Sequence, residues 1–326
     1  VTFAATAEVV RYSGAIPILV DCDPATLNLD LEDVDRKVAD LRAGRLPVRL
    51  AGDADVDGMI PVHVGGWMLP GDEMATTAER HGVWVVEDAA HAFLSAWRSR
   101  EQEPWRTCGA NTAHVTAFSL YANKPITTGE GGVAVTDDGQ LADRMRMMSL
   151  HGLSLDAWTR YRGASWDYRI LAPGYKYNLT DIAAAIGIHQ VRRGDELRRQ
   201  REAIAHRYFE ALDGLDEVEL PARPISTRRH SWHLFPIRLH LDRLSIDRNR
   251  VIEELRQRGI GSSVHWRPLH LHPYYQETFG WRAEHFPVAT REWERLISLP
   301  LYPSMGFDAC DRVSSVLRTI VGRWRR

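Results

Sequence analysis

The chain has 326 residues, of which 44% are hydrophobic and 26% charged, and its net charge is −2. These values are typical of a globular protein with one large or two medium domains, and they exclude a strong global field for binding nucleic acid or membrane. Three widely separated cysteines without a CxxC pair favour reduced thiols and a cytoplasmic location. No apolar run reaches the length of a membrane span.

The first half of the chain alternates predicted strands with predicted helices. Apolar runs predict strands over residues 16–21, 59–64, 83–86, 115–119 and 132–136. Helical spacing and end signals predict helices over residues 30–41, 70–82 and 141–150. This alternation indicates an α/β protein with a three-layer sheet, in which ligands bind at the carboxyl ends of the strands.

The second half begins with a long segment, residues 151–173, that is rich in Trp, Tyr and Arg and lacks a clear period. We expect a functional loop there. Asn178 or Thr180 is expected to cap a helix, and a charged helix over residues 195–212 follows. We place a domain boundary at this helix, between a large domain (1–194) and a smaller α/β domain (195–326). Strands at 232–239 and 260–264 and helices at 247–257 and 308–321 are predicted in the smaller domain.

Two stretches carry residues typical of cofactor chemistry. Lys124 follows the strand at 115–119, and Asp88 follows the strand at 83–86, with His91 three residues later. Alone, Lys124 is equally well explained as a loop lysine in a turn. Together, a lysine and a carboxylate at strand ends suit pyridoxal phosphate, because the amine holds the aldehyde as a Schiff base and the acid keeps the pyridine nitrogen protonated.

The neighbours of these residues leave alternatives open. Glu87 and Asp88 are expected on opposite faces of their strand, so only one of them can face a ligand. The alternative is that they are two acids at a strand end with solvent beyond it. Ser119 suits either a phosphate contact or a bond to its own backbone. There is no Walker motif or GxGxxG after a first strand, and the glycines at 129–132 suit a tight turn.

Five histidines are dense in the second half of the chain, and they raise the question of a metal site: His230, His233, His265, His270 and His272. None forms HExxH and no cysteine is close in sequence, so we expect no metal centre. His265, Arg267 and His270 suit an anion-binding or substrate-facing loop, and a structural role for that loop is equally open.

Several segments together match a known family. They are Glu87-Asp-Ala-Ala-His-Ala92, Phe118-Ser, Lys124, Glu130-Gly-Gly132, Leu150-His-Gly-Leu153, Leu171-Ala-Pro-Gly-Tyr-Lys-Tyr-Asn-Leu-Thr-Asp-Ile182, Trp232-His-Leu-Phe235, Gly259-Ile-Gly261 with His265, and Ser298-Leu-Pro-Leu301. From Thr2 to about Met305, the chain resembles the DegT/DnrJ/StrS family of pyridoxal-phosphate-dependent sugar aminotransferases. It looks closest to the branch that makes UDP-4-amino-4-deoxy-L-arabinose from UDP-4-keto-pentose and glutamate.

The resemblance implies a fold and a set of roles. The fold is the type I, aspartate-aminotransferase-like fold, and the protein is a homodimer with shared active sites. Lys124 is the Schiff-base lysine, Asp88 pairs with the pyridine nitrogen, and Ser119 binds the phosphate. His91 lies against the ring or its O3′ side, Phe3 stacks on the ring, and Asn178 reaches the phosphate in the neighbouring subunit. Candidate substrate contacts are Tyr121, His265, Arg267 and His270.

The expected reaction moves an amino group from L-glutamate to a keto-sugar nucleotide. The sequence departs from the family pattern in two places. The chain begins at Val1 in mid-pattern, so we expect that an N-terminal segment is missing, and Pro125 follows the lysine and lacks an N–H. The alternatives are a non-catalytic or decayed homologue acting as a partner subunit, and a sugar dehydratase, which Lys124 disfavours because such relatives carry histidine there.

Overall fold

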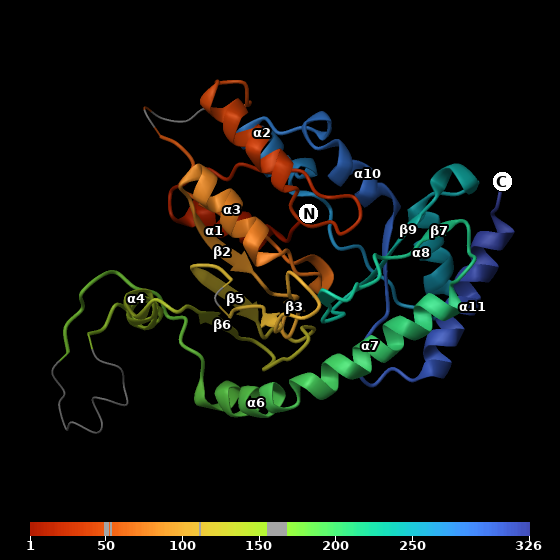
Figure 1. Ribbon diagram of the computed structural model, residues 1–326. Helices are drawn as coiled ribbons and strands as arrows, with labels where there is room; N and C mark the ends of the chain where they lie inside the picture. The colour runs from red at the N-terminus through yellow and green to blue at the C-terminus, as the bar shows by residue number, and fades with distance from the viewer. Residues whose placement is uncertain (49–51, 53, 111, 155–167) are drawn as a thin grey trace.

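The computed structural model describes residues 1–48, 52, 54–110, 112–154 and 168–326. Its larger sheet has the order β1-β2-β5-β6 (Figure 1). The strands are β1 (Gly58–Met59), β2 (Trp84–Asp88), β5 (Val115–Ser119) and β6 (Gly132–Val135). The first three are parallel, and β6 pairs with β5 in the antiparallel sense at one edge. The carboxyl ends of β2 and β5 therefore lie side by side.

Helices surround this sheet: α1 (Ala4–Tyr12), α2 (Leu31–Arg42), α3 (Gly71–His81), α4 (Gly139–Ser149) and α6 (Asp181–Arg192). Their ends follow from local chemistry. The Asp30 side chain accepts from the N–H of Glu32 and caps α2, and Gly82, with φ 68°, ends α3 in the left-handed conformation. Thr180, not Asn178, caps α6, because its hydroxyl accepts from the N–H of Ala183.

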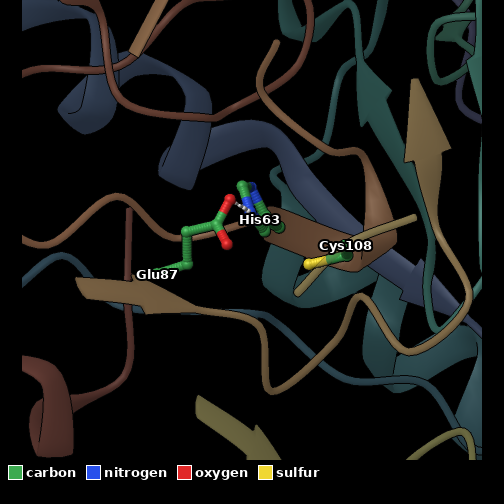
Figure 2. Close-up of side chains that lie close together, drawn as sticks. All are labelled: His63, Glu87 and Cys108. Atoms are coloured by element: carbon green, nitrogen blue, oxygen red, sulfur yellow. Dashed lines mark hydrogen bonds and ion pairs between the residues drawn. The ribbon is translucent and has the colours of Figure 1, made fainter. Parts of the chain in front are cut away.

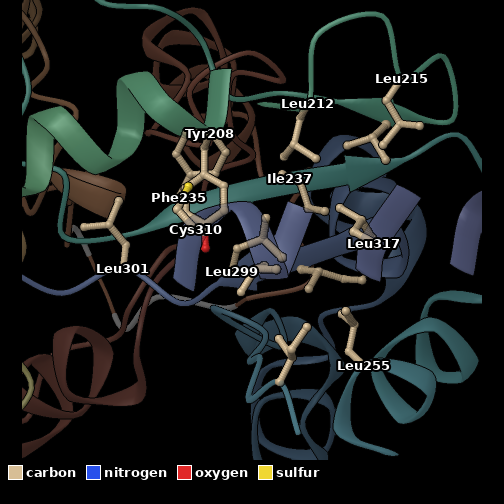
Figure 3. Packing of buried hydrophobic residues seen from close by; sticks show 14 of the residues in the cluster. Tyr208, Leu212, Leu215, Phe235, Ile237, Leu255, Leu299, Leu301, Cys310 and Leu317 are labelled. Carbon is tan, nitrogen blue, oxygen red and sulfur yellow. The ribbon is translucent and has the colours of Figure 1, made fainter. Parts of the chain in front are cut away.

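The C-terminal part has its own antiparallel sheet, ordered β10-β9-β7. Its strands are β7 (Val218–Glu219), β9 (Phe235–Leu239) and β10 (Leu296–Leu299), and its helices are α7 (Gly194–Ala211), α8 (Arg248–Gln257) and α11 (Phe307–Arg323). Side chains from these elements form one apolar core, which includes the fully buried Phe235 and Leu317 (Figure 3). Burial of this core drives the packing of the helices on the sheet.

Residues 269–296 leave this unit and pack on the start of the chain. They contain α9 (Pro273–Phe279) and α10 (Pro287–Arg295), and α10 lies near α2 in Figure 1. The fully buried Trp281 belongs to the same core as Ala7 near the N-terminus. The Lys37 amine donates to the carbonyl of His285 at 3.2 Å. Residues 269–296 therefore share a hydrophobic core with the start of the chain.

A small three-stranded sheet connects the two parts of the chain. It contains β3 (Ala96–Trp97), β4 (Arg106–Thr107) and β8 (Arg228–Arg229) in the order β4-β3-β8. Short 3-10 turns complete the described elements, and they are η1 (Val64–Gly66), η2 (Leu241–Arg243), η3 (Leu269–Leu271) and η4 (Ala283–His285). No helix in the described ranges has both the length and the apolar character needed to cross a bilayer.

Some predicted elements differ from the structure. The predicted strand at 16–21 is wrong: the segment packs Ile16, Ile18 and Leu19 against the N-terminal core without a neighbouring strand. The predicted strand at 260–264 is wrong too, because only Ser263 forms a bridge, to Ser298. The strand predicted at 59–64 is wrong for most of its length, because β1 ends at Met59, Val62 forms only an isolated bridge to Asp88, and Val64–Gly66 is a 3-10 turn. Most of the expected loop at 151–173 lies outside the described residues.

Candidate active site

Asp88 lies at the carboxyl end of β2, opposite Ala117 of β5. Its carboxylate is half-buried and has two donors. The N–H of Ala90 donates to Oδ1 at 3.1 Å, and the hydroxyl of Thr6 donates to Oδ2 at 2.7 Å. Each carboxylate oxygen can accept two hydrogen bonds, so both oxygens retain capacity for a further donor.

Lys124 lies in the turn that follows β5, where its N–H donates to the carbonyl of Tyr121 at 3.0 Å. It is one of three lysines in the chain. The amines of Lys37 and Lys176 donate to His285 and Asn178, whereas the Lys124 amine has no hydrogen bond or ion pair with any described residue. Burial lowers the pKa of Lys124, and the nearby charge of Asp88 opposes that shift. The turn therefore presents a partly desolvated amine close to a carboxylate.

Three histidines lie around this amine. Burial, the charge of Lys124 and His265 together hold the pKa of His91 well below its usual value. Burial and Lys124 lower the pKa of His265 to about 4. His233 lies 4.1 Å from His91 between ring centroids, and its pKa is lowered by burial and by the charges of His91 and Lys124. The wall of the site is therefore made of neutral imidazoles at neutral pH.

Aromatic rings continue this wall. The rings of His91 and Trp266 are stacked, with 5.0 Å between their centroids and 23° between their planes. The centroids of the Trp266 and Phe3 rings are 6.4 Å apart. The Phe3 side chain is 59% exposed at the start of α1. An amine, a carboxylate and a row of flat rings are the groups that suit a planar, aldehyde-bearing nitrogen heterocycle.

The other acid of β2, Glu87, is fully buried, and its carboxylate points toward His63 (Figure 2). One of its oxygens lies 3.1 Å from Nε2 of His63. The other accepts from the hydroxyls of Thr112 at 2.6 Å and Thr116 at 2.5 Å. Burial raises the pKa of Glu87, but the hydrogen bonds and the His63 contact outweigh it and lower the pKa overall. Glu87 is thus a satisfied structural carboxylate, and Asp88 is the acid whose charge acts on Lys124.

His63, Glu87 and Cys108 together have the donor atoms of a metal site, with all three atoms within 4.8 Å of one another. The tautomer of His63 argues against that use. The N–H of Leu69 donates to Nδ1 of His63 at 3.2 Å, so the proton of the neutral ring is on Nε2 and points at Glu87. A metal at Nε2 would require a proton on Nδ1, facing another donor. Burial and Glu87 also raise the pKa of the Cys108 thiol well above its usual value.

Ser119 ends β5, Tyr121 lies in the turn that follows it, and Asn178 lies just before α6. The Ser119 hydroxyl oxygen accepts from the N–H of Tyr121 at 3.3 Å, which is a turn contact and leaves its own proton to donate. Asn178 is exposed and accepts a hydrogen bond from Lys176. Tyr121 is 46% exposed.

The predicted loop residues separate into two groups. His265 is at the site and lies 2.8 Å from the hydroxyl of Ser298. Arg267 donates to the carbonyl of Leu271, and its guanidinium lies over the ring of Trp293. His270 is buried, stacks on Phe286 at 4.6 Å and bonds the hydroxyl of Thr290. The structure therefore brings only His265 of these three to Lys124.

Four residues of the site and its support were not identified from the sequence: Thr6, His63, His233 and Trp266. His233 lies in a segment that matched the family, but no role followed from the match. Its Nδ1 is buried without a hydrogen-bond partner among the described residues. Thr6 and Trp266 carry no local signal, because their positions depend on contacts across the chain.

Comparisons with known proteins agree with this geometry. The profile of the DegT/DnrJ/EryC1/StrS aminotransferase family matches residues 1–318. The chain is 39% identical to the uncharacterized protein MJ1066 of Methanocaldococcus jannaschii, over 99% of this chain and 78% of that protein. It is also 39% identical to the spore coat polysaccharide biosynthesis protein SpsC of Bacillus subtilis, over 98% of this chain and 77% of that protein.

A solved structure also shows similarity to a sugar aminotransferase. The putative sugar aminotransferase Spr1654 of Streptococcus pneumoniae, in its PMP-form, superposes with a TM-score of 0.85 at 28% identity, covering 99% of this chain and 80% of that one. The same protein is also known in a PLP-form. The predicted type I fold and the predicted cofactor of the family, pyridoxal phosphate, are therefore confirmed. The chain belongs to the DegT/DnrJ/EryC1/StrS aminotransferase family.

Proposed function

We propose that this transaminase moves an amino group from L-glutamate to a keto-sugar nucleotide, a UDP-4-keto-pentose or a related sugar, with pyridoxal phosphate held by Lys124. The observation that carries the proposal is the state of the Lys124 amine. It is half-buried, its pKa is lowered by burial, and it has no partner among the described residues apart from the nearby charge of Asp88. A lowered pKa raises the share of the amine that is neutral and therefore nucleophilic.

The residues of the site fit the cofactor. When bound, pyridoxal phosphate supplies an aldehyde that condenses with amines and a ring that takes up electrons from the bond being broken. Lys124 supplies the amine for the covalent link, and Asp88 uses its spare acceptor capacity to hold a proton on the ring nitrogen. His91 and Phe3 would lie against the ring, and Ser119 would donate its hydroxyl proton to the phosphate.

Lys124 has a second task after a donor amino acid displaces it. A neutral amine next to the reacting carbon can take a proton from one atom and return it to another. Burial lowers the pKa of the Lys124 amine and so favours its neutral form, and the charge of Asp88 opposes that shift. The neutral imidazoles of His91 and His265 add no positive charge that would lower the pKa of the amine further at neutral pH.

The choice of substrate is supported by the family and by one named relative, SpsC, a polysaccharide biosynthesis protein. Tyr121 and His265 are the best-placed substrate contacts, because Tyr121 is exposed beside Lys124 and His265 feels its charge. Arg267 and His270, in the same loop as His265, are further candidate contacts to the substrate. The second half-reaction then returns the amino group to the keto-sugar carbon.

We also propose that the protein is a homodimer, for which helix α6 is a candidate contact. Helix α6 exposes apolar side chains on several turns: Ile182 by 78%, Ile186 by 46%, Ile188 by 53% and Val191 by 55%. Exposed apolar patches of this kind mark protein interfaces. Asn178 lies just before this helix and is exposed, so in a homodimer it is available to the phosphate site of the partner subunit.

The proposal is tested by absorbance of the protein mixed with pyridoxal phosphate. The wild-type protein should give the visible band of a lysine-bound cofactor, and Lys124→Ala should abolish both the band and amino transfer. Lys37→Ala and Lys176→Ala are matched controls and should keep both. A band that survives in Lys124→Ala would refute the assignment. An assay of amino transfer over UDP-, dTDP- and GDP-keto-sugars then identifies the acceptor.

A further inference from the structure

Thr6 is the one side chain that hydrogen-bonds the carboxylate of Asp88 among the described residues. Its hydroxyl lies 2.7 Å from Oδ2 of Asp88, although the two residues are 82 positions apart in the chain. A second threonine extends the contact, since the hydroxyl oxygens of Thr2 and Thr6 are 2.6 Å apart.

The direction of these bonds follows from their donors. An ionised carboxylate only accepts, so the single hydroxyl proton of Thr6 goes to Asp88. The oxygen of Thr6 then accepts from Thr2 at 2.6 Å, a shorter contact than the 3.3 Å between the Thr2 hydroxyl and the carbonyl of Phe3, which competes for the same proton. The result is a chain of donors, from Thr2 to Thr6 to Asp88, and each donor in such a chain strengthens the next.

Helix α1 holds Thr6 in place from its other end. Ala7 is buried in the N-terminal core. The guanidinium of Arg11 lies 5.4 Å above the ring of Phe279, and its Nε donates to the hydroxyl of Tyr274 at 3.4 Å. The helix is therefore attached to the segment that contains α9, and Thr6 keeps one position relative to β2.

We propose that Thr6 is a positioning residue for Asp88, with Thr2 as its outer support. This inference rests on the proposed function, in which Asp88 pairs with the ring nitrogen of the cofactor. Thr6 fixes the rotation of the carboxylate, together with the N–H of Ala90 on the other oxygen. It also stabilises the negative charge of Asp88, which favours keeping the proton on the ring nitrogen instead of on the carboxylate.

The test compares four variants of the full chain. Thr6→Val removes the hydroxyl and keeps the shape, and Thr6→Ser keeps the hydroxyl. Thr2→Val removes only the outer support. Thr76→Val is the matched control, because Thr76 is an exposed helical threonine whose hydroxyl bonds the carbonyl of Asp72. The measurements are the dissociation constant for pyridoxal phosphate, the ¹⁵N resonance of the ring nitrogen in labelled cofactor, and the melting temperature.

Thr6→Val should bind the cofactor about tenfold more weakly, the effect of one hydrogen bond to a charged group. Its ¹⁵N resonance should move toward that of the neutral ring, which loss of stability alone would not cause. Thr6→Ser and Thr76→Val should match the wild type, and Thr2→Val should show a smaller change in the same direction. If Thr6→Val does not fold, Thr6→Ala carries the same comparison.

Two results overturn the inference while the proposed function stands. One is a wild-type dissociation constant and ¹⁵N resonance in Thr6→Val, and the other is a Thr6→Ser variant that behaves like Thr6→Val. A wild-type protein without the visible band of lysine-bound cofactor would instead refute the proposed function, and the role of Thr6 with it.

Discussion

Two neighbouring acids on β2 meet opposite environments. Glu87 is fully buried and accepts from His63 (Figure 2) and from the hydroxyls of Thr112 and Thr116, so both of its oxygens have donors. Asp88, one residue later, acts through its charge on a half-buried lysine and keeps unused acceptor capacity. The comparison teaches that burial alone does not mark a functional acid. A group prepared for a ligand has hydrogen-bonding capacity that the protein leaves unused.

Removing Glu87 should give the largest effect, and on stability. Glu87→Ala leaves His63 and two threonine hydroxyls without their acceptor in a fully buried site. Loss of one partner from a buried charged network costs about 3–5 kcal/mol of the free energy of unfolding. Denaturant unfolding measures it. Glu87→Gln keeps an acceptor oxygen and should lose much less, and equal losses in both variants would show that the network is not what matters.

Asp88→Asn should affect activity strongly and stability little, the reverse of Glu87→Ala. The ring nitrogen loses its charged partner, so amino transfer should fall by about 10²-fold, the equivalent of roughly 3 kcal/mol. The free energy of unfolding of the cofactor-free protein should change little, because Asp88 is only half-buried. Steady-state kinetics and denaturant unfolding of the same sample check both halves. A destabilised but fully active variant would reverse the roles assigned to the two acids.

Acid should weaken the fold through buried histidines. Burial lowers the pKa of His230 from 6.5 to about 3. Below pH 6.5 the unfolded chain protonates this histidine and the folded one does not, so the free energy of unfolding falls as the pH drops toward 3. The slope from one such group is up to about 1.4 kcal/mol per pH unit.

His230→Asn removes that titration. Its free energy of unfolding should depend less steeply on pH between 6.5 and 3 than that of the wild type, although the variant is less stable at pH 7, where the buried ring is lost. Unfolding curves across this range measure the slopes. Equal slopes for both proteins would mean that His230 is protonated in the folded state as easily as in the unfolded one.

The smallest effect concerns Ser119. Its oxygen accepts one turn hydrogen bond, and its proton is proposed to reach the cofactor phosphate. Ser119→Ala should weaken cofactor binding by about tenfold, since a hydrogen bond to a charged group is lost. The melting temperature of the cofactor-free protein should change little. Ser99→Ala, at an exposed serine bonded to Asp72, is a control that should leave cofactor binding unchanged.

The parts of the fold that could be predicted are those with local causes. The strand over Val115–Ser119 and the helix ended by Gly82 lie where the sequence places them, because strand propensity and a glycine stop act over a few residues. The segment at 16–21 has the composition of a strand, but a strand also needs a neighbour, and this one has none. Strand β10 was missed, since its Leu296-Ile-Ser-Leu299 run is fully buried and shows no alternation.

Some residues of the candidate site could likewise be predicted from local patterns, and others could not. Lys124, Asp88 and His91 follow strand ends, and the parallel arrangement of β2 and β5 brings those ends together, so sequence reasoning identifies them. The pattern left Glu87 and Asp88 as alternatives, and only the donors around Glu87 decide between them. Thr6, His233 and Trp266 come from distant parts of the chain. Their place depends on how α1 and the C-terminal segments pack, which no local pattern encodes.

The most direct test of the central claim is to reduce the protein–cofactor mixture with borohydride and map the modified peptide by mass spectrometry. The chain has only three lysines, so the assignment is unambiguous. We predict a pyridoxyl group on Lys124 and none on Lys37 or Lys176. A label on either of those two lysines, or no label at all, would contradict the account of Lys124 as the amine that holds the cofactor.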